Sequence, residues 1–233
     1  MKSGPLKTAL YTVGAAAGAY GVYAGLAYAR YGTAETDHFP TRLDAFMPDF
    51  EVRDIHRREV RAPASVTFEA ATRLSMGESP LVRGIFGLRS LPSRIQGTLP
   101  ESSPARPILE DVRALNWQEL EYDPGRSVVM AAVTQPWHAD VEFIGMPAEE
   151  FRTFDEPGFA RIVWSIETIA RGPGNCILQM ETRVATTDRN SREKFRRYWA
   201  LLSPGIIAIR FELLRLTKRL AERAEEQPTR AAW

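Results

Sequence analysis

The stretch KFRRYWALLSPGIIAIRFELLRLTKRL, residues 194–220, decides the fold. Large apolar side chains recur in it at steps of three and four, which is the spacing of one face of an α-helix. They are Phe195, Trp199, Leu202, Ile206, Ile209, Leu213, Leu216 and Leu220. The pattern stays in phase through Ser203-Pro204-Gly205, where a helix would ordinarily end. It therefore predicts one long, kinked helix packed against a continuous surface.

A second apolar line, Ile207, Phe211 and Leu214, runs about 100° around the same helix. The helix is therefore expected to face two partners. Arg210 projects between the two lines and allows two interpretations. Its stem can pack while its head reaches water, or its guanidinium can lie at a cavity mouth and pair with a ligand carboxylate.

Two strand-like segments precede this helix. Residues 159–171 and 175–187 alternate between apolar and polar side chains, and Gly172-Pro173-Gly174 joins them as a hairpin. One apolar and one polar face is typical of an antiparallel sheet covered on a single side. On the polar face, Glu167 and Glu181 are expected to meet solvent and to pair across strands with Arg161 and Arg183; His56 could reach these carboxylates.

The rest of the domain is predicted from turn and capping signals. The expected elements, in order, are a strand at 51–62, a helix at 65–71 capped by Ser65, a helix at 80–88, a loop or lid at 90–107, strands at 117–122 and 127–135 joined by Asp123-Pro124-Gly125, a short strand at 139–144 and a short helix or turn at 147–154. The long helix is expected after Asp188, with Asn190 and Glu193 as a capping-box variant.

The N-terminal segment differs from the rest. Thr8 to Ala29 carries no charge, and as a helix it would span roughly 33 Å. Residues 1–30 are therefore predicted to form a transmembrane anchor, although few of them are strongly apolar. Small residues favour close helix contact in lipid and possible homo-association; they are Gly14, Gly18, Gly21 and Gly25.

Two points about this segment stay open. Ala27-Tyr28-Ala29 fits a signal-peptidase site, so the alternative to an anchor is a cleaved signal peptide. The basic residues Lys2 and Lys7 favour a cytoplasmic N-terminus and a single-pass membrane protein whose domain is extracytoplasmic. The expected organisation is then a linker at 31–50, a domain at 51–223 and a disordered tail at 224–233.

Composition excludes several classes of function. The 233 residues carry a net charge of +1, which gives no reason to expect a nucleic-acid partner. Residues 189–223 hold ten Lys/Arg against three Asp/Glu; a solvated helix face explains this excess, and an anionic membrane surface or acidic partner is the alternative. Cys176 is the single cysteine, expected as a buried thiol. The three histidines have no metal-ligand spacing, and no cofactor motif is found, so no metal and no cofactor are predicted.

Several phrases resemble the START-like or SRPBCC superfamily, whose fold is the helix-grip fold. They are VTQPW (133–137), FDEPGFARIVW (154–164), ETRVATTD (181–188) and KFRRYWALLSPGIIAIR (194–210). They look like an uncharacterised, membrane-anchored bacterial branch that resembles polyketide cyclase-like proteins, over roughly residues 50–223. One departure is Thr67, which separates Val66 from Phe68 where many members have the two side by side.

The resemblance implies an α+β fold in which a curved antiparallel sheet wraps around the C-terminal helix and leaves a cavity for an apolar molecule. The candidates to line it are Trp137, Trp164, Met180, Trp199 and Arg210; the alternative for the aromatic and Met side chains among them is plain core. The leading hypothesis is a membrane-tethered, non-catalytic carrier of a lipid-like or polyketide-like molecule. The alternatives are a cyclase-like enzyme that uses Arg210 or His56, and an interaction module with a filled core.

Overall fold

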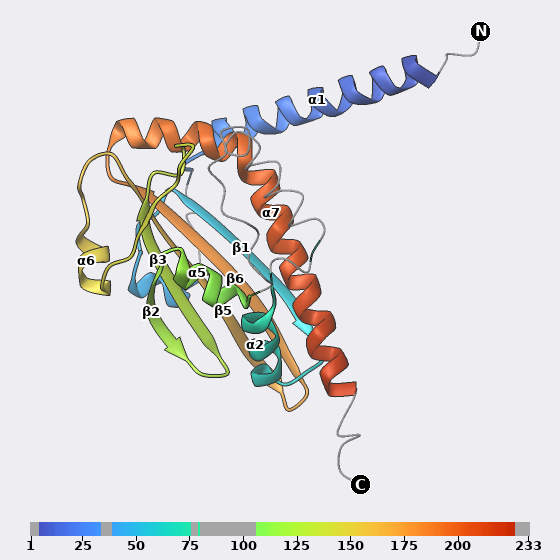
Figure 1. Ribbon diagram of the computed structural model, residues 1–233, viewed down its shortest axis with the longest axis vertical. Helices are drawn as coiled ribbons and strands as arrows, with labels where there is room; N and C mark the ends of the chain where they lie inside the picture. The colour runs from blue at the N-terminus through green and yellow to red at the C-terminus, as the bar shows by residue number, and fades with distance from the viewer. Residues whose placement is uncertain (1–4, 34–38, 76–78, 80–105, 227–233) are drawn as a thin grey trace.

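The computed structural model describes residues 5–33, 39–75, 79 and 106–226. The described part is one antiparallel sheet with a long helix across one face (Figure 1). The predicted helix at 80–88 and residues 90–105 of the predicted loop lie outside the described residues.

The sheet has the strand order β1-β6-β5-β3-β2, and β4 pairs with β3. Every pairing is antiparallel. The strands are β1 (Val52–Val60), β2 (Gln118–Asp123), β3 (Ser127–Thr134), β4 (Phe143–Ile144), β5 (Ala160–Gly172) and β6 (Asn175–Thr186). The predicted hairpins 117–135 and 159–187 are confirmed, and Gly125 takes the positive φ of 75° that its turn requires. The strand predicted at 139–144 is much shorter, because only Phe143 and Ile144 pair with β3.

The helices are α1 (Pro5–Arg30), η1 (Arg42–Ala45), α2 (Ala64–Arg73), α5 (Ile108–Ala114), α6 (Ala148–Thr153) and α7 (Arg189–Glu226). Helix α7 continues through Pro204, as predicted, and changes direction between two arms (Figure 1). We call residues 189–203 the N-terminal arm and residues 205–226 the C-terminal arm. A proline inside a helix removes one backbone hydrogen bond, which accounts for a bend at this point.

Two predicted helix caps are wrong. The carboxylate of Asp188 caps α7, because it accepts from the backbone N–H of Asn190 at 2.7 Å and of Ser191 at 3.0 Å. These bonds, with one from the Ser191 hydroxyl, lower the pKa of Asp188 well below its usual range. Helix α2 begins after Pro63 and has no side-chain cap, so Ser65 lies inside its first turn.

Even-numbered side chains of β5 and β6 point toward α7 and form the main core. Val128, Met130, Ile166 and Leu178 pack there with α2, α5 and the C-terminal arm. The predicted apolar face of the two alternating segments is thereby confirmed, with Trp164 and Ile166 on it as expected. Cys176 is buried in the same core, and burial raises the pKa of its thiol.

The prediction of a sheet covered on one side is wrong. A second core covers the other face, built from η1 and the residues that follow it together with Phe151 of α6. Leu43 and Met47 are buried there, so the segment expected as a linker packs on the sheet. The predicted solvent-side carboxylate Glu181 and its neighbour Arg183 are fully buried beneath it. We call this side the outer face of the sheet.

The charges of the outer face are compensated internally. Glu181 Oε1 accepts from Arg53 Nε at 2.9 Å and from Arg183 Nε at 2.8 Å. Glu167 pairs with Arg42 at 3.0 Å instead of the predicted Arg161. Paired and hydrogen-bonded in this way, charged side chains can be accommodated inside a protein.

The C-terminal end of helix α1 lies against the N-terminal arm of α7 (Figure 1). The hydroxyl of Tyr28 donates to Glu193 at 2.7 Å, and Arg196 Nε donates to the carbonyl of Tyr28 at 2.7 Å. The predicted helix at 8–29 is therefore present. No helix in the described part of the chain, however, is both long enough and apolar enough to cross a membrane, so the transmembrane role is not confirmed.

Candidate functional site

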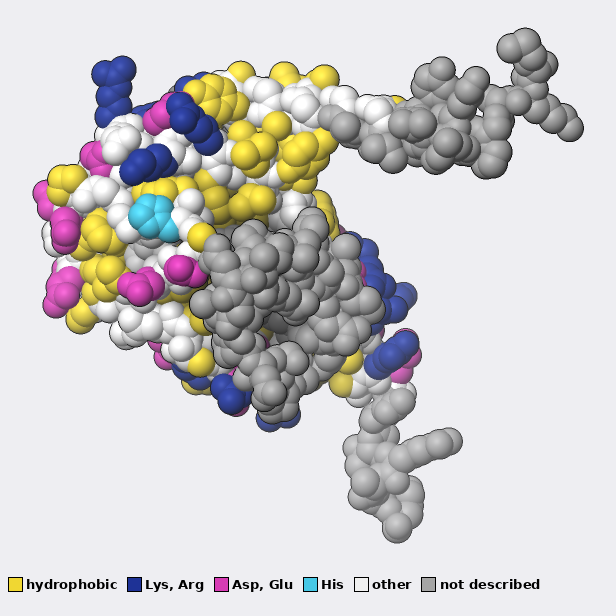
Figure 2. All heavy atoms as spheres, turned by 45° about the horizontal axis from the view of Figure 1, so that its top comes forward, with side chains coloured by type: hydrophobic (Ala, Val, Ile, Leu, Met, Phe, Trp, Pro, Cys, Tyr) yellow, Lys and Arg dark blue, Asp and Glu magenta, His cyan; other side chains and the backbone are white. Residues whose placement is uncertain are grey.

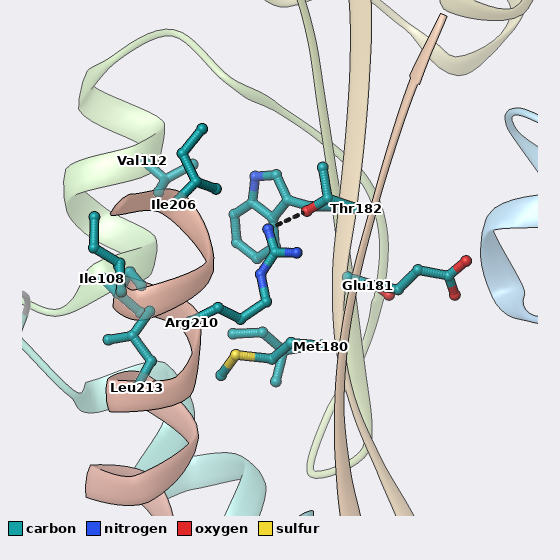
Figure 3. Close-up of a pocket in the computed structure, with 12 residues that line it drawn as sticks. Ile108, Val112, Met180, Glu181, Thr182, Ile206, Arg210 and Leu213 are labelled. Carbon is teal, nitrogen blue, oxygen red and sulfur yellow. Dashed lines mark hydrogen bonds between the residues drawn. The ribbon is translucent and has the colours of Figure 1, made fainter. Parts of the chain in front are cut away.

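A cavity of about 250 Å³ lies between the sheet and the C-terminal arm of α7. Helix α5 closes its third side (Figure 3). Most of the wall is apolar, and it consists of Ile108, Val112, Trp164, Ser165, Ile166, Met180, Glu181, Thr182, Ile206, Ile209, Arg210 and Leu213. The cavity is thus the space that the helix and the sheet leave between them.

Helix α5 contributes Ile108 and Val112, which face the cavity from the side opposite the sheet (Figure 3). This helix was not predicted, because it lies between the loop expected at 90–107 and the strand expected at 117–122. A signal was present: Pro107 precedes the helix, and Ile108 and Val112 are spaced four residues apart.

The sheet side of the cavity follows from strand alternation. Trp164, Met180 and Thr182 point toward α7 because successive strand residues face opposite sides. Ser165 and Glu181 belong to the other parity, so their main chain lines the cavity. Figure 3 shows the Glu181 side chain pointing away from the cavity, toward the outer face.

Arg210 is the polar centre of the wall. Its Nη2 donates to Thr182 Oγ1 at 2.8 Å (Figure 3), and its Nη1 donates to the carbonyl of Asp54 at 3.1 Å. Nη1 also forms an ion pair with Asp54 Oδ2. Burial lowers the pKa of Arg210, and the charge of Asp54 opposes that effect. The guanidinium therefore remains charged inside the protein, with its counter-ion supplied by β1.

This geometry corrects the first interpretation of Arg210, in which its head reaches water. Its side chain is only 14% exposed, so its head does not reach into water. Among the described residues, its anion is Asp54. The pair had no local signal, because 156 residues separate the two partners and Asp54 stands in a charged strand with poor alternation.

The five predicted lining residues divide into two groups. Trp164, Met180 and Arg210 line the cavity. Trp137 and Trp199 do not; they pack near Phe195, where the ring of Trp199 is stacked on that of Phe195 with centroids 6.2 Å apart. The structure thus places these two tryptophans at the N-terminal arm of α7, away from the cavity wall.

His56 does not meet Glu167 or Glu181, because its side chain lies on the α7 side of β1. Its Nε2 lies 2.7 Å from Asp54 Oδ1, and its ring packs against that of Phe211, tilted by 51° with 4.4 Å between centroids. Neither His56 nor Asp54 is among the residues that line the cavity. The chemistry that the described wall offers is hydrogen-bond donation from a guanidinium in apolar surroundings.

No family model and no curated protein sequence matches this chain. Among solved structures, protein CV1439 from Chromobacterium violaceum is similar, with 10% identity and a TM-score of 0.30 over 76% of this chain and 99% of that chain. Norcoclaurine synthase from Thalictrum flavum, in complex with dopamine and hydroxybenzaldehyde, has 10% identity and a TM-score of 0.27 over 84% of this chain and 100% of that chain. CalU16 from Micromonospora echinospora has 14% identity and a TM-score of 0.24 over 75% of this chain and 86% of that chain.

An antiparallel sheet, two helices packed at its side and one long C-terminal helix across its face are the parts of a helix-grip fold. The architecture is α+β and fits that fold.

Proposed function

We propose that this protein binds a small, largely apolar molecule in the cavity between α7 and the sheet. The observation that carries the proposal is the cavity of about 250 Å³ with its apolar wall and single guanidinium. An apolar cavity of about 150 Å³ is enough to take up benzene. A bicyclic aromatic molecule, or a chain of similar volume, is therefore the size class that fits.

Two features favour binding over the alternatives. An interaction module with a filled core would leave no such space. An enzyme that uses an acid or base would place its side chain on the wall; among the described lining residues, the one carboxylate, Glu181, points away from the cavity. These features support a carrier or receptor role.

The test uses naphthalene as a probe. Its binding to the full chain is measured by equilibrium dialysis. Ile206→Trp, on the cavity wall, should weaken binding at least about ten-fold, because the indole fills space that the probe needs. Ile207→Trp is the matched control, since Ile207 does not line the cavity. Equal binding by both variants would place the probe elsewhere, and no binding by the unaltered protein would refute the proposal. Native mass spectrometry after exposure to a lipid extract then identifies the natural ligand class.

We also propose that residues 8–29 hold the domain at a membrane, with the domain on the extracytoplasmic side. Exposed apolar side chains on α1 and on the N-terminal arm of α7 support attachment; they are Tyr20, Val22, Tyr23, Leu26, Leu201 and Leu202. Figure 2 shows hydrophobic side chains along the part of α1 nearest the body. The proposal includes self-association through the four glycines. A Cβ added at Gly14 or Gly25 would meet open space in the described chain, so a second helix has room to approach there.

A reporter fused to the C-terminus tests this placement. An enzyme that is active only outside the cytoplasm should be active in the fusion, and the fusion should sediment with membranes. Activity of a cytoplasm-specific reporter would overturn the orientation, and recovery in the soluble fraction would overturn the attachment.

A further inference from the structure

The charges around the cavity are already balanced by the protein. Arg210 and Glu181 are the charged residues among those that line it. The Glu181 side chain is on the outer face, where it pairs with Arg53 and Arg183. Arg210 therefore brings the one charge that reaches the described wall, and Asp54 neutralises it.

Asp54 is held so that it cannot readily leave Arg210. It is 8% exposed, its Oδ2 is paired with Arg210, and its Oδ1 lies 2.7 Å from Nε2 of His56. Its main-chain carbonyl accepts a further bond from Arg210 at 3.1 Å. A ligand carboxylate would have to share the guanidinium with this anion. Arg183 holds two carboxylates, Glu181 and Asp44, but Arg53 supplies a second positive charge there. Asp54 is ion-paired with no arginine or lysine besides Arg210 among the described residues, so a second carboxylate would add an uncompensated negative charge and would have to be protonated or stay in water.

Arg210 can still donate a hydrogen bond to a ligand. A guanidinium carries five N–H groups, and the described residues accept three hydrogen bonds from this one. A carbonyl, ether or hydroxyl oxygen has the lone pairs that such a donor needs and brings no charge. Most of the rest of the wall is apolar and suits a hydrocarbon body.

We propose that the cavity selects a neutral molecule with an apolar body and one oxygen acceptor, and that Asp54 excludes carboxylic acids by occupying the anion position of Arg210. This inference rests on the proposed function, because it requires that the cavity binds a ligand. It makes Asp54 a specificity-determining residue that lies outside the cavity wall.

The experiment compares three probes of one shape: naphthalene, 2-naphthaldehyde and 2-naphthoate. Dissociation constants are measured by equilibrium dialysis at pH 7 with the full chain. The unaltered protein should bind 2-naphthaldehyde at least about ten-fold more tightly than 2-naphthoate. The aldehyde should also bind more tightly than naphthalene, because its oxygen accepts from Arg210.

Two variants separate charge from shape. Asp54→Asn removes the anion that pairs with the guanidinium and leaves the side-chain volume nearly unchanged. The affinity for 2-naphthoate should therefore rise at least about ten-fold, and this probe should bind more tightly than the other two. Thr182→Val is the matched control: it removes a neutral acceptor from Arg210 and leaves Asp54 in place. It should tighten 2-naphthaldehyde binding several-fold and leave 2-naphthoate excluded.

The outcomes distinguish the two proposals. If the unaltered protein binds none of the probes, the proposed function fails and this inference fails with it. If the probes bind, but 2-naphthoate binds as tightly as 2-naphthaldehyde or Asp54→Asn does not improve it, the selection by Asp54 is refuted while the binding function stands. Should Asp54→Asn not fold, Asp54→Ser removes the same charge and should give the same gain in affinity for 2-naphthoate.

Discussion

Replacing Arg183 by Met should lower the free energy of unfolding by about 3–5 kcal/mol, the usual cost of removing one partner of a buried ion pair. Its side chain is fully buried. It donates to Glu181 at 2.8 Å, to Asp44 at 2.9 Å and to the carbonyl of Met47 at 2.8 Å. Methionine fills similar space but donates nothing, so Glu181 keeps Arg53 as its one ion-pair partner among the described residues.

Equilibrium unfolding in urea measures this loss. The matched control is Arg197→Met, which breaks an ion pair with Glu193 at the surface, where the arginine side chain is 70% exposed. Exposed pairs contribute roughly 0–1 kcal/mol, so this variant should be close to the unaltered protein. Equal effects of the two substitutions would contradict the view that the outer face is a closed, charge-compensated core.

The outer face of the sheet could be predicted from the sequence only in part. Alternation in β5 and β6 correctly predicted which residues share a face, but it could not say what covers the polar one. The burial of Glu181 depends on η1, which lies within residues 31–50, the segment predicted to be a linker. One signal was available: SVVMAAVT in β3 is buried at every position, and a continuous apolar run is typical of a strand covered on both faces.

Helix α7 shows the same limit on a smaller scale. Its existence and its passage through Pro204 could be predicted from spacing, but its exact buried face could not. Leu220, on the predicted stripe, is 39% exposed, whereas Leu214, on the second line, is 1% exposed. The fully buried positions of the C-terminal arm include Thr217 and Ala221, between the two lines. Small side chains let the helix approach its neighbours closely, and a pattern of large apolar residues does not reveal them.

The candidate site was predicted in part for a related reason. Trp164 and Met180 stand on well-alternating strands, and Arg210 interrupts an apolar helix face, so each had a local signal. The missing parts, α5 and Asp54, come from distant segments whose role depends on tertiary contacts. Composition and spacing do not encode which carboxylate meets a given arginine.

Phe195→Ala tests the part of the stripe that lies before Pro204, and it should lower the free energy of unfolding by about 3–5 kcal/mol. Phe195 is 1% exposed, and its ring lies 6.0 Å from that of Tyr31 and 5.6 Å from that of Tyr198. It belongs to the core that joins the N-terminal arm to β1, β5 and β6. Because these rings surround it on several sides, the protein cannot close the cavity that alanine leaves.

The matched comparison is the same substitution at Phe211, in the C-terminal arm of α7. Phe211 is 50% exposed and packs on His56, so Phe211→Ala should cost about 1 kcal/mol or less. Urea unfolding of both variants then compares equal changes of volume at a buried and at a half-exposed site. A small loss at Phe195 would mean that the N-terminal arm is held on the sheet by α1 and its tyrosine contacts instead of by its own apolar face. A loss at Phe211 as large as that expected at Phe195 would mean that the second apolar line contributes to the core after all.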